Sequence, residues 1–151
     1  MANRCTGVFL SVLAGMLLAA TWTSGIAHAQ ARGVTAEELS RSHTDYSAAV
    51  DGPAEIVVAV VRLEPGGRTG WHTHAGPVVA LVTQGTLSRY TEDGCFTVDL
   101  TGSVFQETPM VHEGRNEGAE PVELIVTYVL PAGAPTSDSA PAPASTAVCG
   151  A

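Results

Sequence analysis

The sequence of 151 residues holds 15 acidic residues against 7 basic ones, and its formal net charge at pH 7 is −8. An acidic chain without a basic cluster argues against nucleic acid and anionic membrane surfaces as partners. About 120 residues remain once the N-terminal segment described next is removed, which is enough for one domain with one hydrophobic core.

The N-terminal segment has the three parts of a secretory signal peptide. Arg4 supplies a positive start, residues 8–20 are largely apolar, and Ala27-His28-Ala29 is a small-residue cleavage site. The sequence predicts cleavage after Ala29, which removes residues 1–29 and gives a mature protein that is secreted or periplasmic and no longer attached to a membrane. An uncleaved membrane anchor is the alternative.

The mature chain begins with a pattern typical of a short helix. Thr35 and Glu38 form a capping box, which predicts one or two helical turns from Thr35 to about Ser42. A run rich in Val and Ile from Glu55 to Leu63 then predicts a buried strand, and Pro65-Gly66-Gly67 predicts the turn that closes it.

Further strands are predicted at intervals of about ten residues. They cover residues 71–74, 77–83, 86–91, 95–100, 104–107, 111–116 and 121–130. Short strands separated by Gly-rich turns indicate an all-β sandwich or barrel, which we assign to residues 30–133. Residues 134–151 are rich in Ala, Pro, Ser and Thr, and this composition predicts a disordered tail.

Two histidines, His72 and His74, lie two residues apart between these strands. Residues i and i+2 of a strand point to the same face, so the two imidazoles would project side by side, as a metal ion requires. In a helix the same spacing would place them about 200° apart. The glycines before the pair and the Gly-Pro turn after it favour the strand.

This stretch resembles the first motif of the cupin superfamily. The motif consists of a glycine, five residues, His-x-His, a glutamate and a closing glycine, and Gly66, His72, His74 and Gly85 stand at the matching positions. The position of the glutamate falls on Val78, so one metal ligand of the motif is missing.

A second stretch resembles the second cupin motif, which ends in His-x-x-x-Asn. Gly102, Pro109, His112 and Asn116 carry this resemblance, with one extra residue before Pro109 and a shortened segment after it. Together the two motifs extend over about residues 55–130. The resemblance implies a cupin-type jelly-roll barrel, to which the capping box adds a short N-terminal helix.

The resemblance also implies a metal site at His72, His74 and His112. Such a site would hold one divalent ion, and the sequence does not distinguish among iron, manganese, zinc, nickel and copper. Three neutral imidazoles leave the 2+ charge uncompensated, so the site would favour a small anionic ligand. The alternative is a pocket in which the histidines bind a ligand without metal.

Several functions are compatible with the resemblance. Cupins include dioxygenases, isomerases, decarboxylases, sugar-binding modules and storage proteins, and some three-histidine members bind iron and activate dioxygen. Our leading interpretation is a secreted metal-binding cupin that oxidises or isomerises a small anionic molecule. A non-catalytic binder of a small ligand or metal ion outside the cytoplasm is the second interpretation, and a structural barrel that forms a homodimer is the third.

The cysteines predict a disulfide. Cleavage of the leader removes Cys5 and leaves Cys95 and Cys149 in an oxidising compartment, where a pair of thiols is expected to form a bridge. Pairing between two chains through Cys149 is the alternative.

Overall fold

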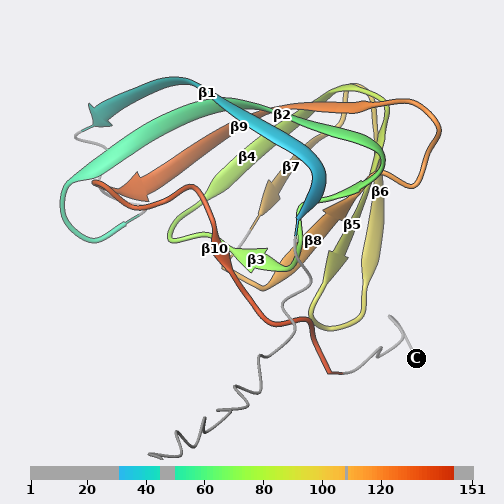
Figure 1. Ribbon diagram of the computed structural model, residues 1–151. Helices are drawn as coiled ribbons and strands as arrows, with labels where there is room; N and C mark the ends of the chain where they lie inside the picture. The colour runs from blue at the N-terminus through green and yellow to red at the C-terminus, as the bar shows by residue number, and fades with distance from the viewer. Residues whose placement is uncertain (1–30, 45–49, 108, 145–151) are drawn as a thin grey trace, which may run out of the picture.

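The computed structural model describes residues 31–44, 50–107 and 109–144. These residues form an all-β domain (Figure 1), and among them no helix has the length and apolar character needed to cross a bilayer. The ten strands are β1 Arg32–Thr44, β2 Ala54–Arg68, β3 His72–Thr73, β4 Val78–Gln84, β5 Thr86–Thr91, β6 Phe96–Leu100, β7 Val104–Glu107, β8 His112–Arg115, β9 Val122–Pro131 and β10 Asp138–Ser139.

The strands form two antiparallel layers that close into a nearly complete barrel. One layer has the order β1-β2-β9-β4-β7, and the other has the order β6-β5-β8-β3-β10. The long strand β2 joins the layers, because Arg68 at its end pairs with Arg115 of β8. This arrangement confirms the predicted jelly-roll fold.

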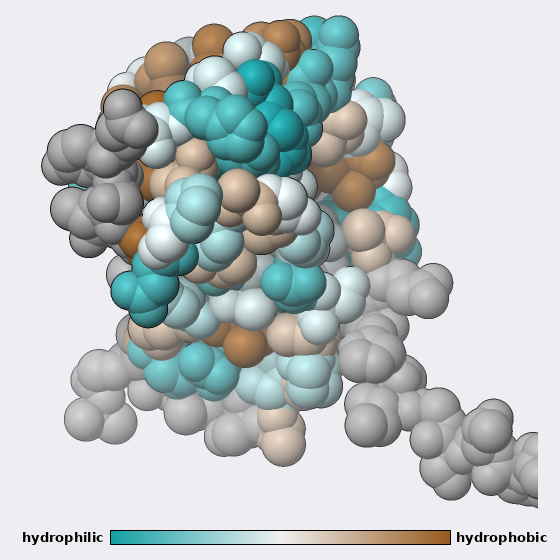
Figure 2. Space-filling view, turned by 90° about the vertical axis from the view of Figure 1, so that its left-hand side faces the viewer, coloured by the Kyte–Doolittle hydropathy of each residue, from teal (hydrophilic) through white to brown (hydrophobic). Residues whose placement is uncertain are grey.

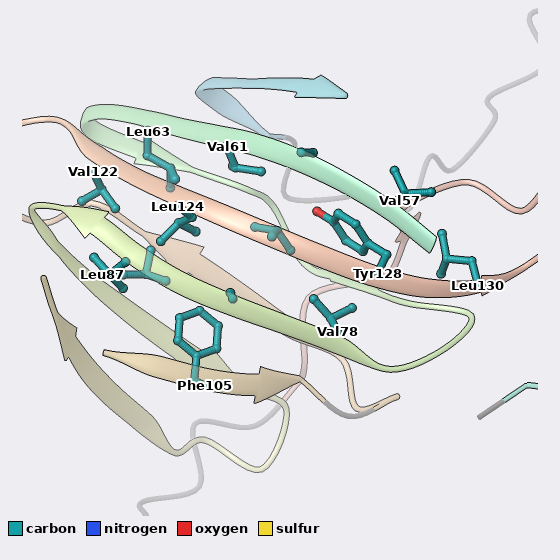
Figure 3. Close-up of a cluster of buried hydrophobic side chains, with 14 residues drawn as sticks. Val57, Val61, Leu63, Val78, Leu87, Phe105, Val122, Leu124, Tyr128 and Leu130 are labelled. Atoms are coloured by element: carbon teal, nitrogen blue, oxygen red, sulfur yellow. The ribbon is translucent and has the colours of Figure 1, made fainter. Parts of the chain in front are cut away.

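The core lies between the layers and consists of inward-facing side chains from alternating strand positions. The strands β2 and β9 pair over ten residues, from Ala54 opposite Pro131 to Leu63 opposite Val122. Figure 3 shows the cluster. Its buried members are Val57, Ala59, Val61, Leu63, Val78, Ala80, Val82, Leu87, Phe105, Val122, Leu124, Val126, Tyr128 and Leu130.

The predicted N-terminal helix is wrong, because residues 32–44 form strand β1. This strand covers the edge of β2 over nearly its whole length, from Arg32 opposite Arg68 to Thr44 opposite Ala54. A helix of one or two turns is marginal in isolation, whereas the open edge of β2 offers a long row of unpaired backbone groups. The register shift between Glu38 and Ser40 also lets Arg41 bind Glu38, with Nη2 and Oε2 2.8 Å apart.

The turn predicted at Pro65-Gly66-Gly67 is also wrong, since β2 runs through it. Gly66 has φ of 74°, which kinks the strand without ending it. The kink brings β2 to the end of β8, where the Gly66 N–H donates to the carbonyl of Asn116 and the Asn116 N–H donates to the carbonyl of Gly67. A turn sequence here bends one long strand from the first layer into the second.

The expectation of a disordered tail is wrong for residues 134–144. Ala134 packs against the core, and β10 pairs with β3, with Asp138 opposite Thr73 and Ser139 opposite His72. The Ala140 N–H donates to the carbonyl of Trp71. Low sequence complexity here accompanies an extended backbone that adds a strand to a sheet edge.

Several large apolar side chains remain exposed on the outer faces of the barrel. Phe96, Val98 and Leu100 of β6 and Val104 of β7 are each more than half exposed. Figure 2 shows that on the face it presents, hydrophobic and hydrophilic residues are interspersed.

Candidate metal centre

The three predicted histidines lie together in the structure. His72 of β3 pairs directly with His112 of β8, and His74 follows β3 by one residue. The ring centroids are 4.9 Å apart for His72 and His74, 4.4 Å for His72 and His112, and 5.0 Å for His74 and His112. One nitrogen from each ring lies within 4.8 Å of the others, so the three residues can hold one ion.

Backbone carbonyl groups fix the same tautomer in all three rings. The Nδ1 atom lies 2.8 Å from the carbonyl oxygen of Gly70 in His72, 2.8 Å from that of Met110 in His112, and 2.5 Å from that of Thr136 in His74. A carbonyl oxygen only accepts, so each Nδ1 carries the proton. In each neutral ring, Nε2 then has the free lone pair, which is the form that binds a metal.

A fourth residue of the site, Glu107 at the end of β7, was not predicted. Its Oε2 atom lies 3.1 Å from Nε2 of His74 and 3.3 Å from Nε2 of His112. Glu107 stands opposite Val78 in the pairing of β4 with β7. A carboxylate therefore approaches His74 and His112 from the strand beside the motif position that Val78 occupies. The three histidines form the predicted cluster that could hold a metal ion, and Glu107 lies beside two of them.

The sequence did contain a signal for Glu107. In the predicted strand 104–107, Phe105 and Glu107 share one face, and Phe105 is a core residue. A carboxylate on the apolar face of a strand needs a partner inside the barrel.

The carboxylate and the imidazoles shift one another's pKa values. Burial alone would raise the pKa of Glu107, but the neighbouring His112 and His74 outweigh burial and hold it well below its usual range. Burial lowers the pKa of His112, yet the Glu107 carboxylate outweighs this effect and raises it above its usual value. Burial and the charge of His112 lower the pKa of His72 to about 4.

The free atoms of the site fit a bound divalent cation. Nε2 of His112 is buried and makes no hydrogen bond of acceptable geometry, although it faces the Glu107 carboxylate. Two ligand atoms on one ion, each bonded at about 2.1 Å, lie roughly 3.0 Å apart at a right angle and roughly 3.4 Å apart at a tetrahedral angle. The separations of 3.1 Å and 3.3 Å between Glu107 and the two imidazoles fall in this interval.

A cavity of about 50 Å³ adjoins His72, His74 and Glu107. The side chain of Thr69 at its wall donates to the carbonyl of Gly70 and accepts from the Gly114 N–H. The ring of Tyr128 lies 5.5 Å from the ring of His74. The other lining residues are Val61, Ala80, Leu87, Phe105, Gly114, Leu124 and Val126, so the polar side chains of the lining are those of Thr69, Tyr128, the two histidines and Glu107.

The other polar residues near the histidines in sequence do not join the site. Glu113 is fully buried, and its Oε2 accepts from Nε of Arg115 at 2.6 Å, so it faces away from the centre. Arg68 lies at the end of β2, and its Nε is buried.

Asn116 of the second motif has a structural role. Its Nδ2 donates to the carbonyl groups of Leu63 and Glu120, and its Oδ1 accepts from the Gly118 N–H.

Two predictions lie outside the described residues. The predicted disulfide between Cys95 and Cys149 is untested because Cys149 is not described. The predicted signal peptide is untested because residues 1–30 are not described.

Comparison with known proteins supports the fold. The family model for the cupin domain matches residues 59–128, which include His72, His74, His112 and Glu107. No curated protein matches the sequence.

Solved structures resemble the chain at low sequence identity. A polyketide cyclase from Streptomyces resistomycificus is 18% identical, with 70% of this chain and 71% of the other covered at a TM-score of 0.54. A cupin-like protein from Thermotoga maritima is 21% identical, with coverage of 72% and 77% and a TM-score of 0.54. A cupin domain from Bordetella pertussis is 20% identical, with coverage of 66% and 95% and a TM-score of 0.50. At these identities the similarity shows the fold.

Proposed function

The chain belongs to the cupin superfamily, and on that basis we propose that it is an exported metalloprotein that binds one divalent ion through His72, His74, His112 and Glu107. The ion and the adjoining cavity together bind a small anionic molecule, which the protein oxidises or isomerises. Imidazole and carboxylate ligands suit iron, manganese, nickel, zinc and copper.

The observation that carries the proposal is the common tautomer of the three imidazoles. Each Nδ1 is held by a carbonyl oxygen, so three Nε2 lone pairs and one carboxylate converge. Within the residues that the structure describes, Nε2 of His112 has no hydrogen-bond partner. Hydrogen bonds from His74 and His112 to Glu107 would require a second proton on each ring. A divalent cation satisfies the four groups without those protons.

The residues around the ion define what it can bind. Four protein ligands fill a tetrahedral ion but leave two positions on an octahedral one. A bound divalent ion acts as a Lewis acid on the ligand atom that it holds. With Glu107 ionised, the site has a net charge near 1+, which suits a singly charged ligand better than the 2+ expected from three histidines alone.

The cavity walls define the rest of the ligand. Val61, Leu124 and Val126 exclude water from one side, so the part of the ligand away from the ion is apolar and small. Burial and the nearby Glu107 raise the pKa of Tyr128. Its hydroxyl group therefore stays protonated at neutral pH and can donate a hydrogen bond to a bound anion.

The second candidate function is non-catalytic binding of a small ligand or a metal ion. One observation favours it: Glu107, the carboxylate among the residues that line the cavity, is also a metal ligand in our proposal and is not free to act as a general base. A tetrahedral zinc ion with no open position would fit this function, whereas an ion with open positions would fit catalysis.

The test measures metal content and affinity. Protein purified from its own compartment should contain one divalent ion per chain by elemental analysis, and a chelated sample should bind one ion by calorimetry. His74→Ala should lose the stoichiometric ion, while His43→Ala, which changes an exposed histidine of β1, should retain it. Equal metal content in wild type and His74→Ala would exclude this site.

A further inference from the structure

The C-terminal strap, which we define as residues 136–140, lies along the strand that carries the metal-binding histidines. Within it, β10 pairs with β3, with Ser139 opposite His72. The Ala140 N–H donates to the carbonyl of Trp71 at 2.9 Å, and Ala140 itself is only 7% exposed. The strap is thus part of the sheet at the edge of the metal site.

The strap also contacts Nδ1 of His74, and this contact differs from those of the other two histidines of the site. In His72 and His112, Nδ1 is held by the carbonyl group two residues earlier in the chain, at Gly70 and Met110. In His74, Nδ1 is held by the carbonyl group of Thr136, 62 residues later. The orientation of His74 therefore depends on a segment outside the two histidine motifs, and outside the matched residues 59–128.

Both ends of the strap are fixed to the barrel. Before it, the Gly133 N–H donates to Oε2 of Glu55 at 3.2 Å, and Ala134 packs against the core. At its far end, Ala140 is buried and bonded to Trp71. The Thr136 carbonyl group is held between two anchored points, so it can fix an imidazole ring.

We propose that the C-terminal strap is a positioning element of the metal site, which holds His74 in its Nδ1–H tautomer through the carbonyl group of Thr136. This inference rests on the proposed metal site and adds a requirement to it: the histidine motifs alone do not complete the centre. When a ligating histidine loses the group that accepts the hydrogen bond from its other ring nitrogen, metal affinity typically falls by about 10- to 100-fold.

A matched pair of substitutions in the full-length protein tests the strap. Ala140→Asp places a carboxylate at a buried position, which would detach the end of the strap from β3. Ala142→Asp adds the same charge two residues later, at an exposed position. Ala140→Pro is a second strap variant, which removes the N–H bonded to Trp71 without adding charge.

The first measurement is the affinity for cobalt(II) or zinc at pH 7, by competition with a chelator. We expect both Ala140 variants to bind about 10- to 100-fold more weakly than wild type, and Ala142→Asp to bind within about twofold of it. The absorption bands of bound cobalt should shift in the Ala140 variants, because an altered His74 changes the ligand field. Wild-type affinity in both Ala140 variants would overturn the proposal.

The second measurement separates the strap from the metal site itself. Nitrogen-15 NMR of the metal-free protein reports which ring nitrogen of His74 carries the proton. We expect Nδ1–H in wild type and in Ala142→Asp, and a mixture of tautomers in the Ala140 variants, with unchanged far-ultraviolet circular dichroism. A wild type that binds no metal would exclude the proposed function, whereas a His74 tautomer unchanged in all variants would overturn the strap.

Discussion

At the scale of single residues, the carboxylate of the proposed metal site lies one strand away from the place where the motif has it. Val78 occupies the motif position and is 1% exposed, and Glu107 stands opposite it on β7. Paired residues of neighbouring strands lie on the same face with Cβ atoms about 5 Å apart. Either position can therefore direct a side chain toward the same ion.

This geometry predicts that the carboxylate can be transferred between the two strands. Glu107→Val alone should weaken divalent metal binding by at least about tenfold, because it removes a ligand and leaves the site with a higher net charge. The double variant Val78→Glu/Glu107→Val has the side-chain composition of wild type and should recover most of the affinity in a calorimetric titration. A double variant as weak as the single one would contradict the equivalence of the two positions.

Asn116 stabilises the end of β8 through three hydrogen bonds to backbone groups. We expect Asn116→Ala to lower the free energy of unfolding by roughly 2–3 kcal/mol, because it leaves buried backbone groups without partners. Urea denaturation of metal-free protein measures this loss. Glu120→Ala, a change of an exposed side chain four residues away, should alter the free energy by less than about 0.5 kcal/mol.

At the scale of elements, Glu55 connects three segments that are far apart in sequence. Its Oε2 accepts from Nη1 of Arg41 on β1 at 2.7 Å and from the N–H of Gly133 after β9 at 3.2 Å. The hydrogen bond from Arg41, followed by that from Gly133, lowers the pKa of Glu55 below its ordinary value. The ionised carboxylate thereby helps to attach β1 to the barrel and to start the turn toward the strap.

This lowered pKa predicts an acid dependence of stability. The contribution of Glu55 is fully present above its unfolded-state pKa, and it is lost as the pH falls through the lower folded-state pKa. Between about pH 5 and about pH 3, wild type should therefore lose more unfolding free energy than Glu55→Gln, whose side chain does not titrate. Urea denaturation of both proteins across this interval measures the difference, and parallel pH profiles would contradict it.

The sequence predicted well those elements whose local residue pattern determines their secondary structure. The predicted strands 86–91 and 104–107 coincide with β5 and β7, since each is bounded by turn residues. The predicted helix at Thr35 failed because the partner of β1 is the edge of β2, which local propensity does not reveal. The prediction of a disordered tail failed at the strap for the same reason, since the strap is ordered by the pairing of β10 with β3.

At the scale of the whole molecule, the sequence located the histidines but not the complete site. His72, His74 and His112 could be identified from period-two spacing and from family motifs. Glu107 is brought to the site by the pairing of β7 with β4, and its face on the strand was the one sign of it in the sequence. Thr136 contacts His74 and lies two residues before β10, which pairs with β3. Contacts that depend on the register between distant strands leave little trace in a single sequence.

The mature protein should begin at Gln30 and contain a disulfide between Cys95 and Cys149. Mass spectrometry of the exported protein, followed by peptide mapping without reductant, measures both features. Reduction should lower the free energy of unfolding by about 2–4 kcal/mol, as expected for a long closed loop. Detection of an intact Met1 would contradict cleavage, and free thiols or a covalent dimer would contradict the intramolecular bridge.

The contact between Thr136 and His74 has a consequence for the order of events in the cell. A polypeptide is synthesised from its N-terminus, so both histidine motifs exist before the segment that orients His74 has been added. The ion-binding geometry is complete only when almost the entire chain is free to fold. In the proposed export of the chain in an unfolded state, the ion would be selected from the supply at the destination, and not from the supply where the chain was translated.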